Sequence, residues 1–317
     1  MKHSKPASTE AGFLVWSKLN DMYYSEQTVL FFDGQFVKAA DAKTDLYSQS
    51  MHYGYAIFEG IRAYETVAGE VAIFKAEAHF QRMKDSADAV GIPLAYTVEE
   101  LINISYEVLS RNGFKNAYLR PLLFCPPNMS LQKAKAAHLM IAAWEWGAYL
   151  GEQLLRVMTS SFQRPNPKAF KVHAKVSGHY VNSIMACQEA KDHGYDEALL
   201  LDANGFVAEG PGANVFFEKD GQLFTPALGN ILPGITRATV IELATELGIP
   251  VVETACTPEA LKQADSAFFC GTAAEVIGWK SIDEYVFPRP WHQSIGYQLQ
   301  KAYKDLVLEK QSNTVQA

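Results

Sequence analysis

Leu232-Pro233-Gly234-Ile235-Thr236-Arg237 is the stretch of sequence that says most about this fold. Its Pro and Gly set a turn, and an amphipathic helix over residues 236–248 is predicted to begin directly after it. At such a helix start the backbone N–H groups are unpaired, and the positive end of the helix dipole lies behind them. With the Thr236 hydroxyl as a further donor, the stretch predicts a phosphate-binding site. The alternative is that Thr236 only caps its helix.

Strand and helix patterns alternate on both sides of this stretch. Gly147 and Gly151 interrupt the pattern near the middle of the chain, and we interpret residues 146–155 as an interdomain loop. This division predicts a small α+β domain over residues 1–145 and a larger domain over residues 156–317. The predicted strands are 29–32, 35–37, 71–74, 117–124, 138–144, 155–160, 197–202, 213–218, 222–225 and 266–269, and the predicted helices are 76–90, 97–111, 178–193 and 236–248.

The composition fits two ordinary globular domains. The chain has 317 residues, of which 48% are hydrophobic and 20% are charged, so it is too apolar for a disordered protein. Its formal net charge of −7 argues against a general nucleic-acid binder. The polar N-terminus lacks a signal core, no stretch approaches a membrane span, and four scattered cysteines show neither disulfide nor zinc spacing. We expect a cytoplasmic protein that handles small molecules, with no metal, nucleic acid or membrane.

Several common catalytic motifs are absent from the sequence. There is no G-x-x-x-x-G-K-[ST], G-x-G-x-x-G, G-x-S-x-G or H-E-x-x-H, which disfavours P-loop kinases, Rossmann dehydrogenases, serine esterases and zincins. A second Gly-Thr turn, Cys270-Gly271-Thr272-Ala273-Ala274-Glu275, follows the predicted strand 266–269. Alone it indicates no more than a capping turn.

Lys175 and Glu209 stand out because of their neighbours. Lys175 lies among small and apolar residues where a loop approaches a helix, so partial burial would make its amine a nucleophile for a Schiff base. The alternative is a solvated lysine in a basic loop. Glu209 is followed by Gly210-Pro211-Gly212, which lets a ligand approach closely, whereas the alternative is an ordinary exposed turn. The aromatic, glycine-containing segments 52–60 and 144–149 are candidates for an apolar pocket or for core packing.

Taken together, these segments resemble the branched-chain amino acid aminotransferases of the fold-type-IV pyridoxal phosphate enzymes. The resemblance is ordered and extends from Val29 to about Lys304. Its motifs are HYGYAIFEGIR (52–62), HFQRMKDSA (79–87), AYLRPLLF (117–124), WGAYLG (146–151), AKVSGHY (174–180), AEGPGANVFF (208–217), LPGITR (232–237) and GTAAE (271–275). The implied fold class is α/β of the α+β type, with a smaller N-terminal α+β domain and a larger C-terminal domain that is β-barrel-like and carries helices.

The resemblance implies a role for each residue of a pyridoxal 5'-phosphate site. Lys175 would form the Schiff base, Glu209 would pair with the pyridine nitrogen and keep it protonated, and Tyr180 would hydrogen-bond the phenolic oxygen. The phosphate would be bound by Arg82, Ile235, Thr236 and Thr272, and the ring face would be covered by Leu232.

The resemblance also implies a substrate site. An apolar side-chain pocket would be formed by Tyr53, Phe58, Trp146 and Tyr149, and the α-carboxylate would be received by Tyr118, Thr272 and Ala273. Arg120 would bind the second, distal carboxylate of glutamate. Three stretches depart from the usual family pattern. Ser177-Gly178-His179 stands in place of Gly-Gly-Asn, the acidic turn carries Pro211 and Ala213 where Ala and Glu are common, and residues 124–130 replace a longer glycine-rich loop.

The implied function is transamination from L-leucine, L-isoleucine or L-valine to 2-oxoglutarate in two ping-pong half-reactions, by a homodimer or larger homo-oligomer. One alternative is a D-amino acid or (R)-amine aminotransferase or an aminodeoxychorismate lyase, which share the lysine and the glutamate. Tyr118 with Arg120, and the WGAYLG segment, favour the branched-chain interpretation. Another alternative is a non-catalytic pyridoxal-phosphate-binding or structural protein, which would have no need for the complete set of Lys175 and Glu209 with their partners.

Overall fold

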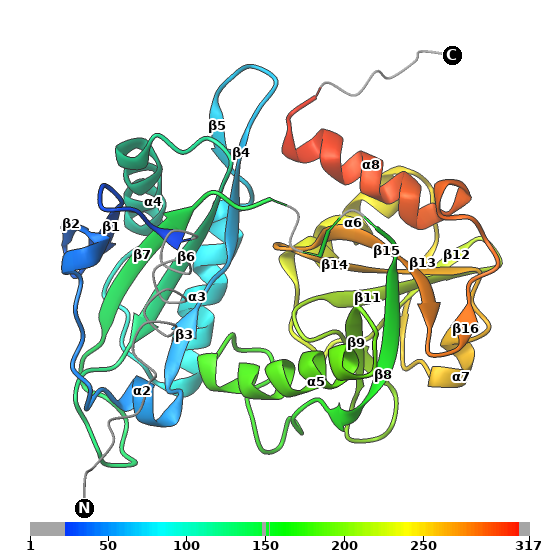
Figure 1. Cartoon of the computed structure of the whole chain (residues 1–317), viewed down its shortest axis with the longest axis horizontal. Helices are drawn as coiled ribbons and strands as arrows, with labels where there is room; N and C mark the ends of the chain where they lie inside the picture. The colour runs from blue at the N-terminus through cyan, green and yellow to red at the C-terminus, as the bar shows by residue number, and fades with distance from the viewer. Residues whose placement is uncertain (1–22, 148–149, 152, 311–317) are drawn as a thin grey trace, which may run out of the picture.

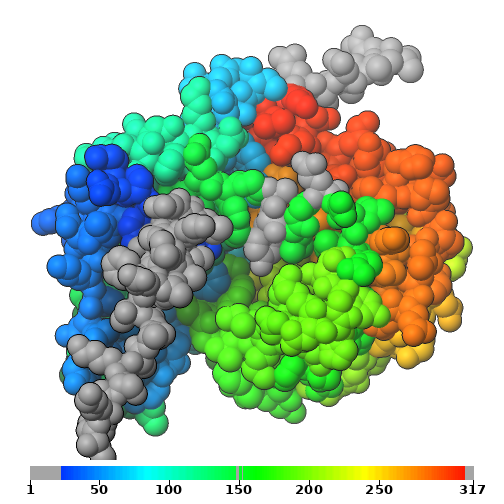
Figure 2. Space-filling model, in the orientation of Figure 1, coloured from blue at the N-terminus to red at the C-terminus, as the bar shows by residue number. Residues whose placement is uncertain are grey.

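The computed structural model describes residues 23–147, 150–151 and 153–310. It contains two β-sheets that follow one another along the chain (Figure 1). The first sheet ends with β7 at Trp144 and the second begins with β8 at Leu155, so the predicted interdomain loop 146–155 lies almost entirely between them. Figure 2 shows the two halves packed side by side, the N-terminal half on the left and the C-terminal half on the right.

The first sheet is antiparallel throughout, in the order β2-β1-β7-β6-β4-β5, with β3 also paired to β6. Helices α3 (Ala76–Val90) and α4 (Val98–Asn112) pack on it and bury the apolar core of this half (Figure 1). The remaining elements are β1 (Val29–Phe32), β2 (Gln35–Lys38), a 3-10 turn (Ala39–Asp41), α2 (Gln49–Tyr53), β3 (Ala56–Phe58), β4 (Ile61–Glu65), β5 (Val71–Ile73), β6 (Ala117–Phe124) and β7 (His138–Trp144).

Local signals explain how several elements of this half begin and end. Asp33 and Gly34 have φ of 44° and 86°, which suits the two-residue turn of a hairpin, and β1 pairs with β2 across them. Thr97 and Glu100 form a capping box at the start of α4, in which each side chain accepts a hydrogen bond from the backbone N–H of the other residue. The Asp33-Gly34 pair and the Thr97–Glu100 spacing are thus local sequence signals of a hairpin and of a helix start.

The second sheet closes into a barrel. Its strands follow the order β10-β9-β8-β15-β14-β11-β12-β13, and an additional pairing of β10 with β11 closes a ring. The pairs β8–β9, β8–β15 and β12–β13 are parallel. The strands are β8 (Leu155–Gln163), β9 (Glu197–Leu201), β10 (Val207–Glu209), β11 (Asn214–Lys219), β12 (Gln222–Pro226), β13 (Val251–Thr254), β14 (Ser266–Gly271), β15 (Glu275–Ile282) and β16 (Tyr285–Val286). The predicted barrel-like C-terminal domain is confirmed.

Helices cover this barrel on two sides. Helix α5 (Tyr180–Asp192) packs on β8 and β9, while α6 (Ile235–Glu246) and α8 (Ile295–Val307) pack on each other and on β14 and β15 (Figure 1). The shorter helices are α7 (Pro258–Leu261) and the 3-10 turns Ser177–His179 and Trp291–Gln293. No helix among the described residues is long and apolar enough to cross a membrane.

The prediction that the helix after Pro233 is amphipathic was wrong. Helix α6 buries polar Thr236, Arg237 and Thr239 as well as apolar Val240 and Leu243. The buried Arg237 is held by its Nη2, which donates to the Pro226 carbonyl and pairs with Glu253. A helix covered on several sides does not divide into one apolar and one polar face.

Several elements were not predicted from the sequence, among them β3, β4, β15 and α8. Strands β3, β4 and β15 are buried on both faces over most of their length, so they lack the apolar–polar alternation of a half-exposed strand. Helix α8 did carry a usable signal, because its buried residues Leu299, Tyr303 and Val307 recur every four positions.

Candidate active site

One cavity collects all the residues predicted to bind the cofactor. Both halves of the chain contribute to its wall, α3 from the first half and the barrel with its loops from the second. The lining includes Arg82, Lys175, Tyr180, Glu209, Leu232, Ile235, Thr236 and Thr272. The structure thus places these side chains around one space, and their individual roles stay predictions.

The start of α6 lies in the wall of this cavity. Its N-cap is Gly234, and no side chain caps the helix, so Thr236 is not the cap and that alternative is wrong. The first backbone N–H groups of α6 therefore lack a helical partner. A Cβ at Gly234 would lie 2.0 Å from the Asn214 side-chain oxygen, so only glycine permits this close turn.

Arg82 on α3 reaches the same turn from the first half of the chain. Its Nη1 donates to the Pro233 carbonyl at 3.0 Å. Its Nε and Nη2 donate to the two carboxylate oxygens of Glu59, each at 2.8 Å. Burial would raise the pKa of Glu59, but the charge of Arg82 and the hydrogen bonds from His79 and Arg82 outweigh burial and hold it well below its usual range.

Lys175 is half-buried, which contradicts the alternative of a solvated lysine. Its Nζ donates to the Tyr180 hydroxyl at 2.8 Å and lies 4.9 Å from the centre of the Phe58 ring. Its backbone is held by two hydrogen bonds, from its N–H to Ser86 and from the Phe58 N–H to its carbonyl. The amine therefore has a fixed position beside a phenol and an aromatic face.

Two glycines bring the lysine segment against the first half. The Gly178 N–H donates to the Gly54 carbonyl at 3.0 Å. A Cβ on Gly54 would lie 2.7 Å from the Gly178 Cα, and Gly54 has φ of 65°. Both the close approach and the left-handed backbone require glycine at position 54.

Glu209 is buried at the end of β10, so it is not an exposed turn residue. The Asn214 amide donates to it at 3.0 Å, and the Leu232 N–H donates at 3.2 Å. Arg164 forms an ion pair with it at 2.8 Å, although its Nε–H is not aligned for a hydrogen bond. Burial raises the pKa of Glu209, and the Arg164 charge opposes that rise only in part.

A second cavity of about 380 Å³ adjoins the first and shares Lys175, Tyr180 and Thr272 with it. We call it the substrate-side cavity. Of the residues predicted to bind substrate, its lining contains Phe58, Tyr118, Arg120, Trp146, Thr272 and Ala273. Gly60 is required here, because a Cβ would lie 1.9 Å from the Tyr118 hydroxyl. The Arg120 guanidinium lies 4.7 Å from the centre of the Phe58 ring, and its buried Nε has no hydrogen-bond partner in the described part of the chain.

Two predicted substrate residues are not placed in this cavity. Tyr53 is 45% exposed, its hydroxyl donates to the Met129 carbonyl, and it lines a separate surface pocket. Tyr149 lies outside the described residues.

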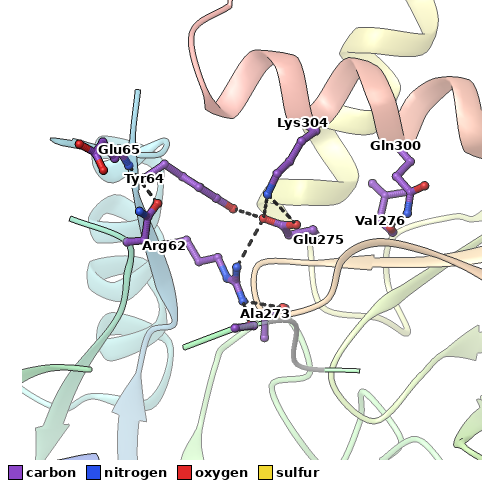
Figure 3. Close-up of polar contacts among 10 residues, drawn as sticks. Arg62, Tyr64, Glu65, Ala273, Glu275, Val276, Gln300 and Lys304 are labelled. Carbon is purple, nitrogen blue, oxygen red and sulfur yellow. Dashed lines mark hydrogen bonds and ion pairs between the residues drawn. The ribbon is translucent and has the colours of Figure 1, made fainter. Parts of the chain in front are cut away.

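A polar network braces the turn that follows β14. Glu275 accepts hydrogen bonds from the Tyr64 hydroxyl at 2.8 Å and from Arg62 at 3.4 Å (Figure 3). Lys304 from α8 lies 3.4 Å from both of its oxygens. Arg62 also donates to the Ala273 carbonyl at 3.3 Å. Because Arg62 and Tyr64 lie on β4, the network joins the turn of the second half to the first sheet.

Sequence reasoning missed the residues that support the site: Glu59, Arg62, His79, Arg164, Asn214 and Glu275. Glu59, for example, lies in the aromatic segment 52–60, which was predicted to form an apolar pocket or part of the core. A charged residue within an otherwise apolar stretch was the available signal, since a buried charge needs a partner.

The donor groups around the two cavities fit one kind of cofactor. A fixed primary amine forms a Schiff base with an aldehyde, a buried carboxylate pairs with a protonated ring nitrogen, and a helix start with an arginine binds a phosphate. Lys175, Glu209 and the α6 turn with Arg82 supply these three groups in one cavity. Fold and site together define a pyridoxal-phosphate enzyme of fold type IV.

Comparison with known proteins agrees with this class. The family model described as amino-transferase class IV matches residues 56–282, and the chain belongs to that family. The cofactor of the class IV aminotransferases is pyridoxal phosphate. Within the family, the chain is similar to branched-chain-amino-acid aminotransferases. The enzyme of Pseudomonas aeruginosa is 41% identical over 288 residues, which cover 89% of this chain and 94% of that one. The Escherichia coli K12 enzyme is 40% identical over 262 residues, which cover 80% and 84%.

Solved structures show the same relationship. The branched-chain aminotransferase of Thermoproteus uzoniensis with norvaline superposes with a TM-score of 0.86 at 40% identity, covering 90% of this chain and 96% of that one. The branched-chain amino acid aminotransferase of Thermobaculum terrenum in its PLP-form has a TM-score of 0.86 at 32% identity, with 91% and 96% covered. The fold-type-IV prediction is confirmed.

Proposed function

We propose that this aminotransferase moves the amino group of L-leucine, L-isoleucine or L-valine to 2-oxoglutarate. The observation that carries the proposal is the position of Arg120, a cation in a cavity that aromatic Phe58, Tyr118 and Trp146 also line, next to the Lys175 amine. An aromatic wall suits a branched aliphatic side chain, and the arginine suits the second carboxylate of glutamate. The similarity to branched-chain-amino-acid aminotransferases supports the same substrates.

Lys175 has the central role in this proposal. When bound, pyridoxal phosphate supplies an electron sink that makes the substrate Cα–H acidic. The Lys175 amine would hold the cofactor, and its Nζ, once free, would take the proton from the substrate Cα and deliver it to the cofactor side. The Tyr180 hydroxyl, 2.8 Å away, orients this amine. One residue thus serves as anchor and as base, which requires the fixed geometry that Ser86 and Phe58 provide.

Glu209 would pair with the opposite end of the cofactor. Its carboxylate would accept a hydrogen bond from a protonated ring nitrogen, and its negative charge would favour that protonated form. Asn214 and the Leu232 N–H fix its orientation. The turn at Gly234, the Thr272 hydroxyl and Arg82 would bind the phosphate.

Carboxylate binding separates this proposal from its rivals. The Tyr118 hydroxyl and the turn at Thr272 and Ala273 line the substrate-side cavity, and we assign them to the α-carboxylate. Transaminases of D-amino acids or (R)-amines and aminodeoxychorismate lyase use the same lysine and glutamate with a different carboxylate site. Tyr118 together with Arg120 favours an L-amino acid with a dicarboxylate as its partner substrate.

The proposal is tested by rate measurements and by absorbance spectra. With 2-oxoglutarate as acceptor, the initial rate with L-leucine should far exceed the rate with D-alanine, and activity on D-alanine alone would contradict the proposal. The purified protein should show the visible absorbance of a lysine-bound cofactor, and Lys175→Ala should lose it. A protein that stays colourless after addition of pyridoxal phosphate would count against enzymatic function altogether.

We also propose that the protein works as a homodimer. Helix α2 with the residues just before it, the loop 128–132 and one face of α5 expose large apolar side chains. In a monomer such side chains are usually buried in the core. These residues are Leu46, Tyr47, Met51, Tyr53, Met129, Leu131, Val181, Ile184 and Met185, and we call them the apolar patch. Met51 also lines a cavity that shares Leu122 and Ser177 with the substrate-side cavity. A second copy seated on the patch would thus border the substrate entrance.

A reducing compartment such as the cytoplasm suits this chain, and we propose that location. Its four cysteines are all free, and three of them are buried. Burial raises the pKa of Cys270 above the ordinary thiol range and that of Cys256 to about 11. Thiols that stay protonated are poor nucleophiles, so these residues act as packing groups.

A further inference from the structure

Glu59 is a carboxylate that the proposed chemistry does not use, although its partner Arg82 lines the cofactor cavity. Its side chain is fully buried in the link between β3 and β4. Its oxygens accept hydrogen bonds from Arg82 Nε and Nη2, and one of them lies 2.8 Å from His79 Nδ1. A buried carboxylate persists only with such partners.

This pairing occupies one edge of the Arg82 guanidinium. An arginine carries five N–H donors in a rigid plane. Within the described residues three of them are used, two by Glu59 and one by the Pro233 carbonyl. The two that remain belong to Nη1 and Nη2. Guanidinium donors of this kind bind phosphate oxygens.

His79 completes the arrangement without adding a charge. It is buried on α3, one turn before Arg82, and burial lowers the pKa of His79 more than the neighbouring Glu59 raises it. The imidazole is therefore neutral, and its Nδ1 carries the hydrogen that faces Glu59. Among the described residues, Arg82 is the charged side chain that pairs with Glu59, so the guanidinium is held against this carboxylate.

We propose that Glu59 is a positioning residue that fixes the Arg82 fork toward the cofactor phosphate, with His79 fixing Glu59 in turn. The inference rests on the proposed role of Arg82 as a phosphate ligand. An arginine side chain has several rotatable bonds, so a free one would have to be ordered whenever phosphate binds. Glu59 orders it in advance, and through Arg82 it also joins α3 of the first half to the Pro233 turn of the second.

The test compares pyridoxal phosphate with pyridoxal, which lacks the phosphate. Dissociation constants are measured on cofactor-free protein by absorbance and by quenching of tryptophan fluorescence. For Glu59→Gln we expect the constant for pyridoxal phosphate to rise about tenfold or more, as for a misaligned charge-assisted hydrogen bond. The constant for pyridoxal should change by less than about twofold. Glu107→Gln, which alters an exposed carboxylate paired with Arg111 on α4, should change neither.

A double-mutant cycle shows whether Glu59 acts through Arg82. Arg82→Met and the double variant Glu59→Gln/Arg82→Met should lose the same phosphate-dependent affinity, because without the arginine there is nothing to position. The double variant also removes both buried charges, so it remains informative if Glu59→Gln alone does not fold. Glu59→Asp, which keeps the charge on a shorter side chain, should show an intermediate loss.

The outcomes separate this inference from the proposed substrates. Equal weakening of pyridoxal and pyridoxal phosphate, or losses that multiply in the double variant, would overturn the positioning role. A wild-type chain with no preference for the phosphorylated cofactor would overturn it as well. If the wild-type chain prefers pyridoxal phosphate but does not transaminate L-leucine, the substrate proposal fails and the role of Glu59 stands.

Discussion

Arg120 is a cation surrounded by aromatic rings. Its guanidinium lies 4.7 Å from the Phe58 ring centre, 5.3 Å from that of Tyr118 and 5.8 Å from that of Trp144. Stacking on aromatic faces stabilises the charge without satisfying all of its N–H donors. The side chain is thus ready to bind a carboxylate and does not need to break an existing ion pair first.

Replacing this cation should affect the two partner substrates unequally. For Arg120→Met we expect the KM for 2-oxoglutarate to rise about 30-fold, which corresponds to about 2 kcal/mol for a lost charge pair. The KM for the 2-oxo acid of leucine, which has no distal carboxylate, should change by less than about threefold. Steady-state kinetics of both half-reactions measures the difference. Arg156→Met, at an exposed pair with Asp196, serves as the control and should leave both values unchanged.

His179 is the other residue whose environment makes a prediction. It is buried, packs edge-on against Phe170 with ring centres 5.1 Å apart, and lines the cofactor cavity. Burial, with a smaller effect from the Arg164 charge, lowers the pKa of His179 to about 4. In the unfolded chain its pKa would be about 6.5.

The free energy of unfolding should therefore fall as the pH drops from about 6.5 to about 4. In that window the unfolded chain binds a proton at His179 and the folded chain does not, so acid favours unfolding. The contribution amounts to roughly 1–3 kcal/mol. Urea titrations at several pH values should show a shallower pH dependence for His179→Asn. The exposed His292→Asn should keep the wild-type slope, and an unchanged slope in both variants would contradict the assignment.

At the level of elements, α4 shows how a local signal and tertiary packing reinforce each other. Its capping box at Thr97 and Glu100 satisfies N–H groups that would lack partners at the helix start. One turn later, Leu101 begins the buried face that also includes Val108 and Leu109. The cap sets where the helix begins, and that start places the apolar face toward the first sheet.

Removal of the cap should destabilise the protein by about 1 kcal/mol, because the Glu100 N–H loses its acceptor. Thr97→Ala is the variant, and Thr97→Ser, which keeps the hydroxyl, should stay within a few tenths of a kcal/mol of the wild-type protein. Urea denaturation followed by circular dichroism measures both. Equal stability of the alanine and serine variants would show that the cap contributes nothing in this context.

At the scale of the whole molecule, the site exists because two sheets meet. Arg82 and Phe58 belong to the first half, while Lys175, Glu209 and Thr272 belong to the second. The contact between Gly54 and Gly178, the Arg82–Pro233 hydrogen bond and the Arg62–Glu275 pair hold the halves together around the cavities. Neither half alone contains both the amine and all the residues proposed to bind the phosphate.

The apolar patch yields the prediction at this scale. Ile184→Glu should convert the homodimer into a monomer, because a charge in a buried apolar interface is costly. Size-exclusion chromatography with light scattering measures the mass. Val286→Glu is the matched control, since Val286 is a comparably exposed apolar residue on β16, outside the patch. A wild-type chain that is already monomeric would contradict the dimer proposal.

Much of this protein is predictable from its sequence, because the relevant signals are local. The hairpin at Asp33-Gly34, the cap at Thr97 and the turn at Gly234 each depend on a few neighbouring residues. The resemblance to a family added the lysine, the glutamate and the phosphate ligands, and it identified fold type IV. Strands buried on both faces, such as β3 and β15, were not predicted because their sequences do not alternate between apolar and polar residues.

The sequence alone predicted the class of chemistry, since the ordered motifs around Lys175, Glu209 and the α6 turn together resemble one family. Only the tertiary structure decided which charges are paired and which are available. Glu59 takes one edge of Arg82, Arg164 stands against Glu209, and Arg120 keeps a donor without a partner among the described residues. The reason is physical: burial makes an unpaired charge costly and a paired one stable, and burial depends on residues distant in sequence. Residues 232–237 illustrate both contributions. The turn at Gly234 is set by local sequence, whereas Arg82, which hydrogen-bonds to Pro233 in this turn, comes from the other half of the chain.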